Sequence, residues 1–297
     1  MPNIVVSGGS GYLGQFVIAE LARLPRASEV HVVALYCSQK LEVPPSITAA
    51  LGSFTAKKTD ITSPSDVAAL LASIDGAVDV VVHCAAMTSI AACARSAAQA
   101  ASTNCPAALL DAVGEARILY TSTDIVYGGE KAPYGESAPG AAEPLNVYGR
   151  TKLECERAIA ARWAVGRFSI LRCSNMLGPP SPFTPRRTKF IQWLDGAVGG
   201  ASDGDGDGDA GVTLFAEEVR SFVAVTDVAA LLAQLATAAE DDALPPVICC
   251  GGGEGLSRVA LAAELATLRA YAVPRRIVAT TRAAHAAAEG VPLEYAY

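Results

Sequence analysis

Tyr148 and Lys152 form a pair whose side chains could act together on a proton. They stand four positions apart in the run NVYGRTKLECE, which is rich in helix formers. Four positions is just over one helical turn, so both side chains would lie on one helix face. A nearby ammonium favours the phenolate and lowers the pKa of a tyrosine from its usual value of about 10. We therefore expect Tyr148 to be a proton donor assisted by Lys152.

The spacing alone does not identify a site, because Tyr-x-x-x-Lys occurs three times. The other copies are Tyr36/Lys40 and Tyr127/Lys131. Tyr36 leaves an expected strand into a loop, and Tyr127 is followed by two glycines that would break a helix. Only Tyr148 continues into good helix formers, so this pair is the candidate.

The first residues of the chain predict a dinucleotide site. An apolar run at 4–6 enters the glycine turn SGGSGYLG, and a helical pattern follows from Gln15. The turn would close tightly at its first glycine, let a pyrophosphate approach at its second and pack helix on strand at its third. The free N–H groups of the helix start would then face phosphate. The expected cofactor contacts here are Gly8, Gly11, Tyr12, Leu13 and Gly14, and the alternative is a glycine-rich turn without a ligand.

The end of the second expected strand, at 30–35, favours NADP(H) over NAD(H). In NAD-preferring sites an acidic residue near this end binds the ribose 2′-hydroxyl. The stretch after Tyr36 contains Ser38 and Lys40 and no carboxylate. We expect Ser38 and Lys40 to accept a 2′-phosphate, and the alternative is that Lys40 is an ordinary solvated lysine.

Three further strand ends complete the expected cofactor edge. After the strand at 54–58, Asp60 would accept from the adenine amino group and Ile61 would cover the ring; alternatively Asp60 caps the next helix. The β-branched run at 79–83 predicts a central parallel strand that ends in a core histidine. Ala85 and Ala86 after it are small enough for a cofactor to lie against them. The strand at 117–121 would deliver Thr123 to the same edge, where ligands bind in such sheets.

Composition narrows the class of protein. The 297 residues are 51% hydrophobic and 18% charged, which predicts a folded globule. A net charge of −7 and the lack of a basic block argue against nucleic acid or an anionic membrane surface as partner. Eight cysteines lack metal-ligand spacing, and no apolar run approaches the ~18 residues that span a bilayer. We expect a soluble cytoplasmic protein without a metal site.

With Thr123 added, the chain resembles the extended short-chain dehydrogenase/reductase family, the NAD-dependent epimerase/dehydratase superfamily. It is most similar there to the dTDP-4-dehydrorhamnose reductase group, which includes proteins like the methionine adenosyltransferase regulatory β subunit. The segments that carry the resemblance are SGGSGYLG (7–14), HCAAMT (83–88), TSTDIVYGG (121–129), PLNVYGRTKLECE (144–156) and RSFVAVTDVA (220–229). It implies that Tyr148 donates a proton as hydride from NADPH reaches a ketone, that Thr123 steadies the oxyanion, and that Lys152 also holds the nicotinamide ribose.

Departures from the family concern the substrate. Asp124 is followed by Ile125, where the dehydratases of the superfamily have Asp-Glu, and this argues against dehydration. The run LRCSN at 171–175 stands where rhamnose-type reductases resemble LRTSW, so the sugar contact differs or is absent. The resemblance implies Thr88, Asn175 and Arg220 as substrate-binding residues. Arg186, Arg187 and Lys189 suit either a nucleotide diphosphate or a solvated loop.

The expected fold is α/β, with a Rossmann-type doubly wound parallel sheet in residues 1–170. A smaller C-terminal α/β substrate lobe, which can interleave with the first domain, is expected in 171–297. We expect Asp203 to Asp209 to be a flexible insertion rather than a calcium loop, because position 12 is Leu214 and not Glu.

The expected function is NADPH-dependent reduction of a keto group on a nucleotide-activated sugar, by a protein that could form a homodimer. One alternative is a non-catalytic NADP-binding regulatory subunit with a protein partner. Another is a sugar-nucleotide epimerase or dehydrogenase.

Overall fold

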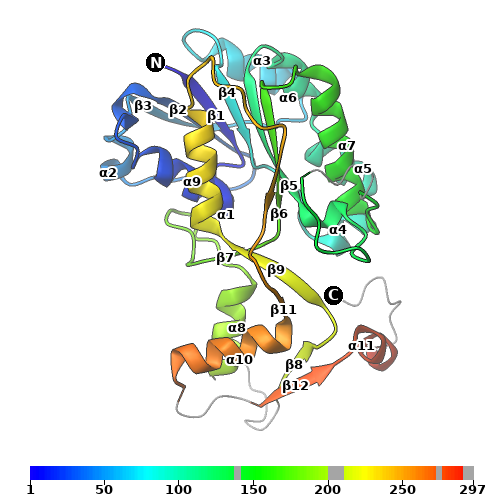
Figure 1. The fold of residues 1–297 in the computed structure, drawn as a ribbon. Helices are drawn as coiled ribbons and strands as arrows, with labels where there is room; N and C mark the ends of the chain where they lie inside the picture. The colour runs from blue at the N-terminus through cyan, green and yellow to red at the C-terminus, as the bar shows by residue number, and fades with distance from the viewer. Residues whose placement is uncertain (137–141, 200–210, 272–275, 290–297) are drawn as a thin grey trace. The chain divides into compact units, whose positions relative to one another are not determined.

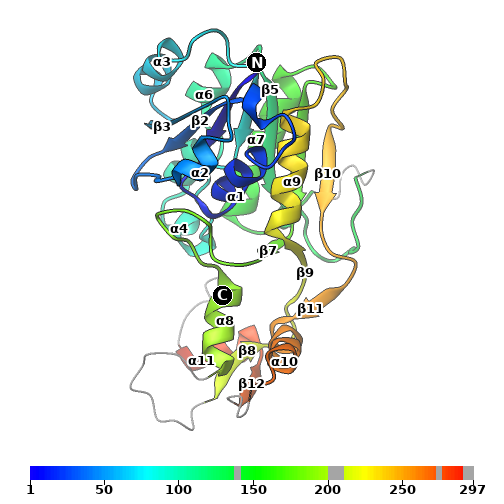
Figure 2. The ribbon, with the colours of Figure 1, turned by 90° about the vertical axis from the view of Figure 1, so that its left-hand side faces the viewer.

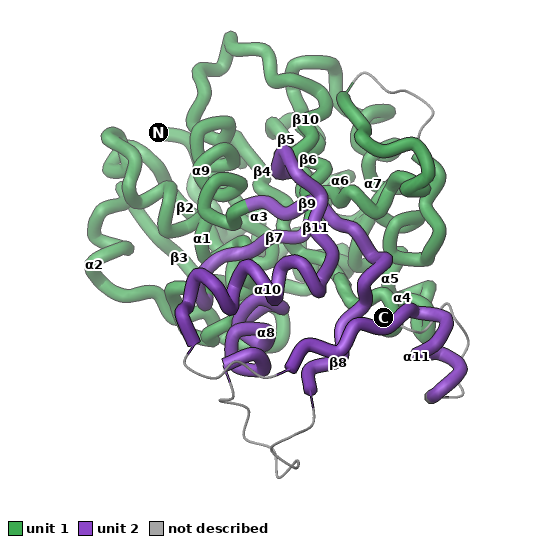
Figure 3. Tube along the Cα trace, turned by 60° about the horizontal axis from the view of Figure 1, so that its bottom comes forward, with its two compact units in different colours: residues 1–174, 181–187, 224–250 green, residues 175–180, 188–223, 251–297 purple. Residues whose placement is uncertain are grey.

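The computed structural model describes residues 1–136, 142–199, 211–271 and 276–289. The chain divides into two compact units (Figure 3). Unit 1 comprises residues 1–174, 181–187 and 224–250, and unit 2 comprises 175–180, 188–223 and 251–297. The chain therefore leaves unit 1 and re-enters it twice. The expected assignment of cofactor to residues 1–170 and substrate to 171–297 stays a prediction.

Unit 1 is built on a seven-stranded sheet in the order β10-β6-β5-β4-β1-β2-β3, in which all neighbouring strands are parallel. The strands are β1 (Asn3–Ser7), β2 (His31–Tyr36), β3 (Ser53–Lys58), β4 (Val80–His83), β5 (Arg117–Thr123), β6 (Phe168–Cys173) and β10 (Val247–Cys250). The chain runs outward from β1 in both directions, and this confirms the predicted Rossmann-type doubly wound sheet. Its central strands are buried on both faces, as the continuous β-branched runs predicted.

Helices cover both faces of this sheet (Figures 1 and 2). Helices α1 and α9 pack together on one face, and α3, α5, α6 and α7 lie on the other. The helices of unit 1 are α1 (Tyr12–Leu21), α2 (Pro45–Thr48), α3 (Pro64–Ala72), α4 (Ile90–Arg95), α5 (Ala97–Asn104), α6 (Ala107–Ala112), α7 (Val147–Arg162) and α9 (Val225–Ala236), with 3₁₀ turns η1 (Ala27–Glu29) and η2 (Asp124–Val126). Ile159 of α7 and Trp163, directly after its end, join the core over β5 and β6.

Unit 2 contains two small sheets, β11-β9-β7 and β12-β8. Its elements are β7 (Asn175–Leu177), α8 (Phe190–Gly199), β8 (Val212–Phe215), β9 (Val219–Ala224), β11 (Gly255–Ser257), α10 (Arg258–Arg269), β12 (Ile277–Thr280) and α11 (Arg282–Glu289). Buried residues of α8, β8 and α10 form its core. The Asp203–Asp209 insertion lies outside the described residues.

Every helix in the described part of the chain is too short or too polar to span a bilayer.

Candidate active site

The N-terminal turn of α7 places the tyrosine–lysine pair. Asn146 caps the helix, because its Oδ1 accepts from the Gly149 backbone N–H at 2.9 Å. A Cβ at Gly149 would lie 2.5 Å from the Ile125 carbonyl oxygen. Only glycine lets the helix start this close to the turn after β5, and this contact brings Tyr148 to the end of that strand.

The Tyr148 phenol lies close enough to the Thr123 hydroxyl for the two side chains to interact. Thr123 is the last residue of β5, and both residues are buried. Burial raises the pKa of Tyr148 well above its ordinary value, and the nearby Asp124 adds to the rise, while the interaction with Thr123 opposes it. The predicted lowering of this pKa by Lys152 is therefore wrong for the free protein, because burial of the phenol has the largest effect on the pKa and raises it. The phenol carries its proton.

Lys152 lies one turn beyond Tyr148 and is only 1% exposed. Burial lowers the pKa of its ammonium to about 8. The Nζ atom lies 4.2 Å from the centroid of the Tyr120 ring, and this cation–π contact partly replaces the lost water. Lys152 can thus change charge close to neutral pH.

A buried ion pair supports the helix one turn further on. Glu156 of α7 binds Arg172 of β6 at 2.6 Å and also accepts from the Ser122 hydroxyl. Arg172 in turn donates to the Tyr127 phenol at 2.9 Å. These contacts tie α7 to β5 and β6. This ion pair was not predicted from the sequence, although a glutamate four residues after Lys152, on the same helix face, was a signal for it.

Asn104 fixes the segment after β4 against α7. Its Oδ1 accepts from the Met87 backbone N–H at 2.7 Å, and its Nδ2 donates to the Thr151 hydroxyl at 2.9 Å. Thr151 donates in turn to the Tyr148 carbonyl at 2.9 Å. This chain of bonds orients the stretch that contains Ala85, Ala86 and Thr88 relative to α7.

The glycine turn is shaped as the sequence predicted. Gly8 has a φ of +69°, and a Cβ there would lie 2.7 Å from the Ala85 backbone nitrogen. A Cβ on Gly14 would lie 2.3 Å from the Gly8 carbonyl oxygen, so α1 packs directly on the turn. Gly11 caps α1 without a side-chain hydrogen bond. The positive end of the α1 dipole at this turn suits a phosphate.

The ends of β2 and β3 carry the residues expected near the adenosine. Ser38 and Lys40 are exposed in the stretch after β2. Lys58, the last residue of β3, is exposed and pairs with Tyr36 in the sheet register. Lys58 was not predicted, because only the register places it beside the end of β2.

Asp60 does not cap α3. Its Oδ1 accepts from the Thr62 backbone N–H at 2.9 Å and from the Thr62 hydroxyl at 2.7 Å, and these bonds lower the pKa of the carboxyl. The cap is Ser63, whose Oγ accepts from the Asp66 backbone N–H at 3.3 Å. The alternative of Asp60 as a helix cap is therefore wrong. Ile61 beside it is buried, and the adenine contacts of both residues stay a prediction.

The predicted substrate residues fall in both units. Thr88 is exposed in unit 1, whereas Asn175 and Arg220 belong to unit 2. Arg220 forms a 2.7 Å ion pair with Glu218, which also binds Arg258 at 3.3 Å. A phosphate at Arg220 would have to share this arginine with Glu218. The substrate roles of the three residues stay predictions.

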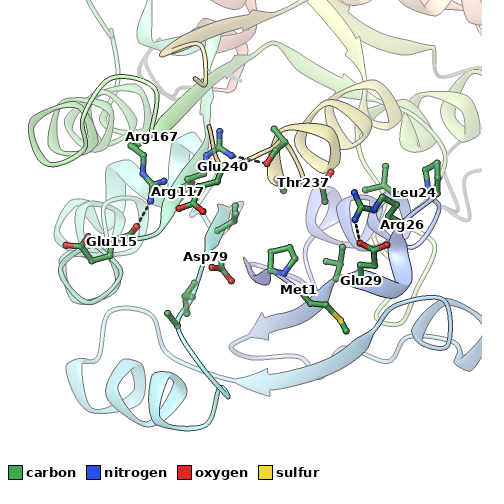
Figure 4. A pocket seen from close by; sticks show the side chains of 18 residues that line it. Met1, Leu24, Arg26, Glu29, Asp79, Glu115, Arg117, Arg167, Thr237 and Glu240 are labelled. Carbon is green, nitrogen blue, oxygen red and sulfur yellow. Dashed lines mark hydrogen bonds and ion pairs between the residues drawn. The ribbon is translucent and has the colours of Figure 1, made fainter. Parts of the chain in front are cut away.

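A cavity of about 650 Å³ opens at the amino ends of the strands (Figure 4). Its lining includes Asp79 before β4 and Arg117 at the start of β5. Arg117 is buried and donates to the carbonyl oxygens of Ala238 and Ala239 after α9, at 3.1 and 3.0 Å. Its donors are thus used to hold the end of α9 against the sheet. The cavity lies on the opposite edge from Tyr148 and the glycine turn, so it is not the candidate active site.

Comparison with protein-family models finds one that matches residues 4–251, the NAD dependent epimerase/dehydratase family. Methionine adenosyltransferase 2 subunit beta of Danio rerio is 42% identical over 82 residues, 27% of this chain and 25% of that protein. A probable low-salt glycan biosynthesis reductase of Haloferax volcanii is 31% identical over 193 residues, 64% of this chain and 58% of that protein. The matches thus span a quarter and somewhat over half of these relatives.

Solved structures share the fold at low identity. A dTDP-4-dehydrorhamnose reductase of Clostridium acetobutylicum superposes with a TM-score of 0.70 at 21% identity, covering 94% of this chain and 84% of that one. A UDP-glucose 4-epimerase of Thermotoga maritima, solved with UDP-glucose, gives 0.72 at 20%, covering 94% and 85%. A dTDP-4-dehydrorhamnose reductase of Bacillus anthracis, in complex with NADP, gives 0.70 at 18%, covering 96% and 86%.

Proposed function

The chain belongs to the NAD-dependent epimerase/dehydratase family, and from this premise we propose that it reduces a keto group on a nucleotide-activated sugar with NADPH. The observation that carries the proposal is the proximity of the buried Tyr148 and Thr123 side chains, one helical turn from buried Lys152. A protonated phenol at the carboxyl edge of a Rossmann sheet is placed to protonate an oxygen.

The residues of unit 1 fit a dinucleotide. The diphosphate would lie over the N-terminus of α1, where the N-cap residue Gly11 has no side chain to obstruct it. When bound, NADPH supplies a hydride for the keto carbon. Lys152 would hold the nicotinamide ribose through its ammonium.

Tyr148 supplies the proton in this proposal. Its raised pKa keeps the phenol protonated at neutral pH, so it can donate to the keto oxygen as negative charge develops there. Thr123 steadies the same oxygen with its hydroxyl. The phenolate that remains is stabilised by the Thr123 hydroxyl and by the positive charge of Lys152 until a proton returns from water.

The preference for NADPH rests on the ends of β2 and β3. The stretch after β2 presents Ser38 and Lys40 and has no carboxylate for a ribose 2′-hydroxyl. Lys58 adds a second exposed ammonium at the neighbouring strand end. Two lysines favour a 2′-phosphate by charge.

The names of similar proteins support a nucleotide-activated sugar as the proposed substrate. The Haloferax volcanii relative is called a glycan biosynthesis reductase, and two structures of the same fold are dTDP-4-dehydrorhamnose reductases. Ile125 after Asp124 is consistent with reduction rather than dehydration.

The test is turnover with a panel of keto-sugar nucleotides. Purified protein is mixed with NADPH and dTDP-4-keto-6-deoxy sugars, and absorbance at the reduced nicotinamide band is followed. We expect consumption of NADPH that falls at least ~100-fold in Tyr148→Phe. Tyr134→Phe is the control, because it removes a phenol that accepts from the Lys131 backbone N–H at 3.0 Å and lies outside the candidate site. Tight NADPH binding without turnover of any keto-sugar would contradict the reductase.

The second candidate is a regulatory subunit that binds NADP(H) without catalysis. It is favoured by the 42% identity over 82 residues to a protein named a subunit of methionine adenosyltransferase 2. Its test is co-purification with a methionine adenosyltransferase catalytic chain and a change in the activity of that chain. A sugar-nucleotide epimerase, the third reading, would instead convert UDP-glucose to its C4 epimer without net consumption of cofactor.

A further inference from the structure

Residues 181–187 form a short segment that returns to unit 1 and lies on the start of α1. The side chain of Gln15 is buried and binds this segment through both the nitrogen and the oxygen of its amide. The Gln15 Nε2 donates to the Pro185 carbonyl oxygen at 2.7 Å, and its Oε1 accepts from the Phe183 backbone N–H at 2.7 Å. A fully buried amide that bonds a distant segment twice fixes that segment against the helix.

Further hydrogen bonds hold the segment 181–187 in place. The Ser181 Oγ accepts from the Arg187 backbone N–H at 2.6 Å, and the Ser181 N–H donates to the Arg187 carbonyl at 2.8 Å. Thr184 exchanges two backbone hydrogen bonds with Glu42. Ser181 and Phe183 are buried. These hydrogen bonds therefore fix the backbone of Arg187 in one place.

Arg187 lies against the glycine turn. Its Nε donates to the Ser10 carbonyl oxygen at 3.2 Å, and Ser10 stands between Gly8 and Gly11. No acidic side chain forms an ion pair with Arg187 in the part of the chain that the structure describes. The guanidinium is half-buried, so its charge is less screened than that of a free surface arginine.

We propose that Arg187 binds the diphosphate of the dinucleotide cofactor. The assignment rests on the proposed cofactor binding. A guanidinium offers donors in a fork that matches two phosphate oxygens, and the N-terminus of α1 favours the same charge from the other side. From the sequence, Arg187 was grouped with Arg186 and Lys189 as a candidate for a nucleotide diphosphate. In the structure Arg187 lies in unit 1 and contacts the glycine turn, whereas Lys189 belongs to unit 2.

The geometry separates this role from recognition of the 2′-phosphate. Ser10 lies in the β1–α1 turn, whereas Lys40 and Lys58 lie at the ends of β2 and β3. A residue that binds the diphosphate should contribute equally to the affinity for NADH and for NADPH, because both cofactors carry the diphosphate. A residue that binds the 2′-phosphate should contribute to the affinity for NADPH alone.

The experiment compares Arg187→Gln with its neighbour Arg186→Gln, which removes an exposed arginine from the same segment. NADPH, NADH and ADP-ribose are each titrated by calorimetry into the full chain, and thermal melting checks that both variants fold. We expect Arg187→Gln to weaken all three ligands by a similar factor of about ten or more, the range of a charge-assisted hydrogen bond. Arg186→Gln should leave all three unchanged.

Unchanged affinities in Arg187→Gln would overturn the proposal, as would a loss confined to NADPH. Equal losses in both arginine variants would also overturn it, because they would indicate a general effect of charge. If the unaltered protein bound none of the three ligands, the proposed function would fail together with this assignment, and that result is distinct from the other outcomes.

Discussion

Glu156, four residues after Lys152 on α7, forms a 2.6 Å ion pair with Arg172 of β6 inside unit 1. The Glu156 side chain is 4% exposed and that of Arg172 is 13% exposed. Each charge is compensated by the other, and the Ser122 hydroxyl adds a further bond to the carboxylate. The ion pair and the bond from Ser122 thus hold α7 against β6 and β5.

Removal of one partner should destabilise the protein strongly. Glu156→Ala leaves Arg172 buried without its counter-charge, and we expect the free energy of unfolding to fall by about 3–5 kcal/mol. Urea denaturation followed by circular dichroism measures it. Replacing both residues with apolar ones, Glu156→Leu with Arg172→Met, should recover part of the loss. Glu29→Gln is the control, because its ion pair with Arg26 is exposed and its loss should not change the midpoint measurably.

The buried ammonium of Lys152 should make stability depend on pH. Burial lowers its pKa from 10.5 to about 8 in the folded chain, so the unfolded chain binds more protons between these values. Stability from this group therefore rises as pH increases from about 8 to about 10.5, by an amount on the order of 3 kcal/mol. Urea midpoints at pH 7.5 and 10 measure the change. Lys152→Met should reduce this rise; an equal rise in the variant would rule out Lys152 as its source.

The ends of β2 and β3 should set the choice of cofactor. Lys58→Ala and Lys40→Ala remove ammonium groups expected near the 2′-phosphate, so each should weaken NADPH about tenfold and leave NADH unchanged. Lys57→Ala is the matched control, because successive side chains of a strand point to opposite faces. Calorimetric titration of both cofactors gives the ratio. A ratio that stays constant in Lys40→Ala and Lys58→Ala would refute the preference for NADPH.

Local patterns predicted much of the fold and the centre of the site. The β-branched runs at β1, β2 and β4 are buried on both faces. A strand buried on both faces needs apolar residues at successive positions, and these can be recognised directly in the sequence. Likewise Asn146 and the helix formers after it locate α7, and the glycine turn requires the residue types it has. Each of these features depends on a few consecutive residues.

The features that could not be predicted depend on distance along the chain or on burial. Arg187 meets Ser10 only because Gln15 binds a segment 170 residues later in the sequence. The pKa of Tyr148 was expected to fall because the spacing to Lys152 is visible in the sequence, whereas the burial that raises it is not. Spacing shows which residues are neighbours, but desolvation requires the whole core.

The close approach of α7 to β5 gives the sharpest test of the catalytic geometry. In Gly149→Ala the new Cβ would start 2.5 Å from the Ile125 carbonyl oxygen and 2.8 Å from the Pro144 Cβ, so the helix start must shift. The shift would move Tyr148 relative to Thr123, and we expect kcat to fall at least tenfold. NADPH affinity should change little, because the glycine turn is not touched.

Gly196→Ala provides the matched control for this variant. Gly196 lies in α8, and a Cβ there would meet nothing within 4 Å. Alanine has the higher helix propensity at both positions, so propensity alone would stabilise both variants. Steady-state kinetics of the two variants at saturating NADPH therefore isolate the contact with Ile125. A Gly149→Ala protein with full activity would show that the Tyr148–Thr123 geometry tolerates displacement of the helix, and the proximity of these side chains would then not be the feature on which proton transfer depends.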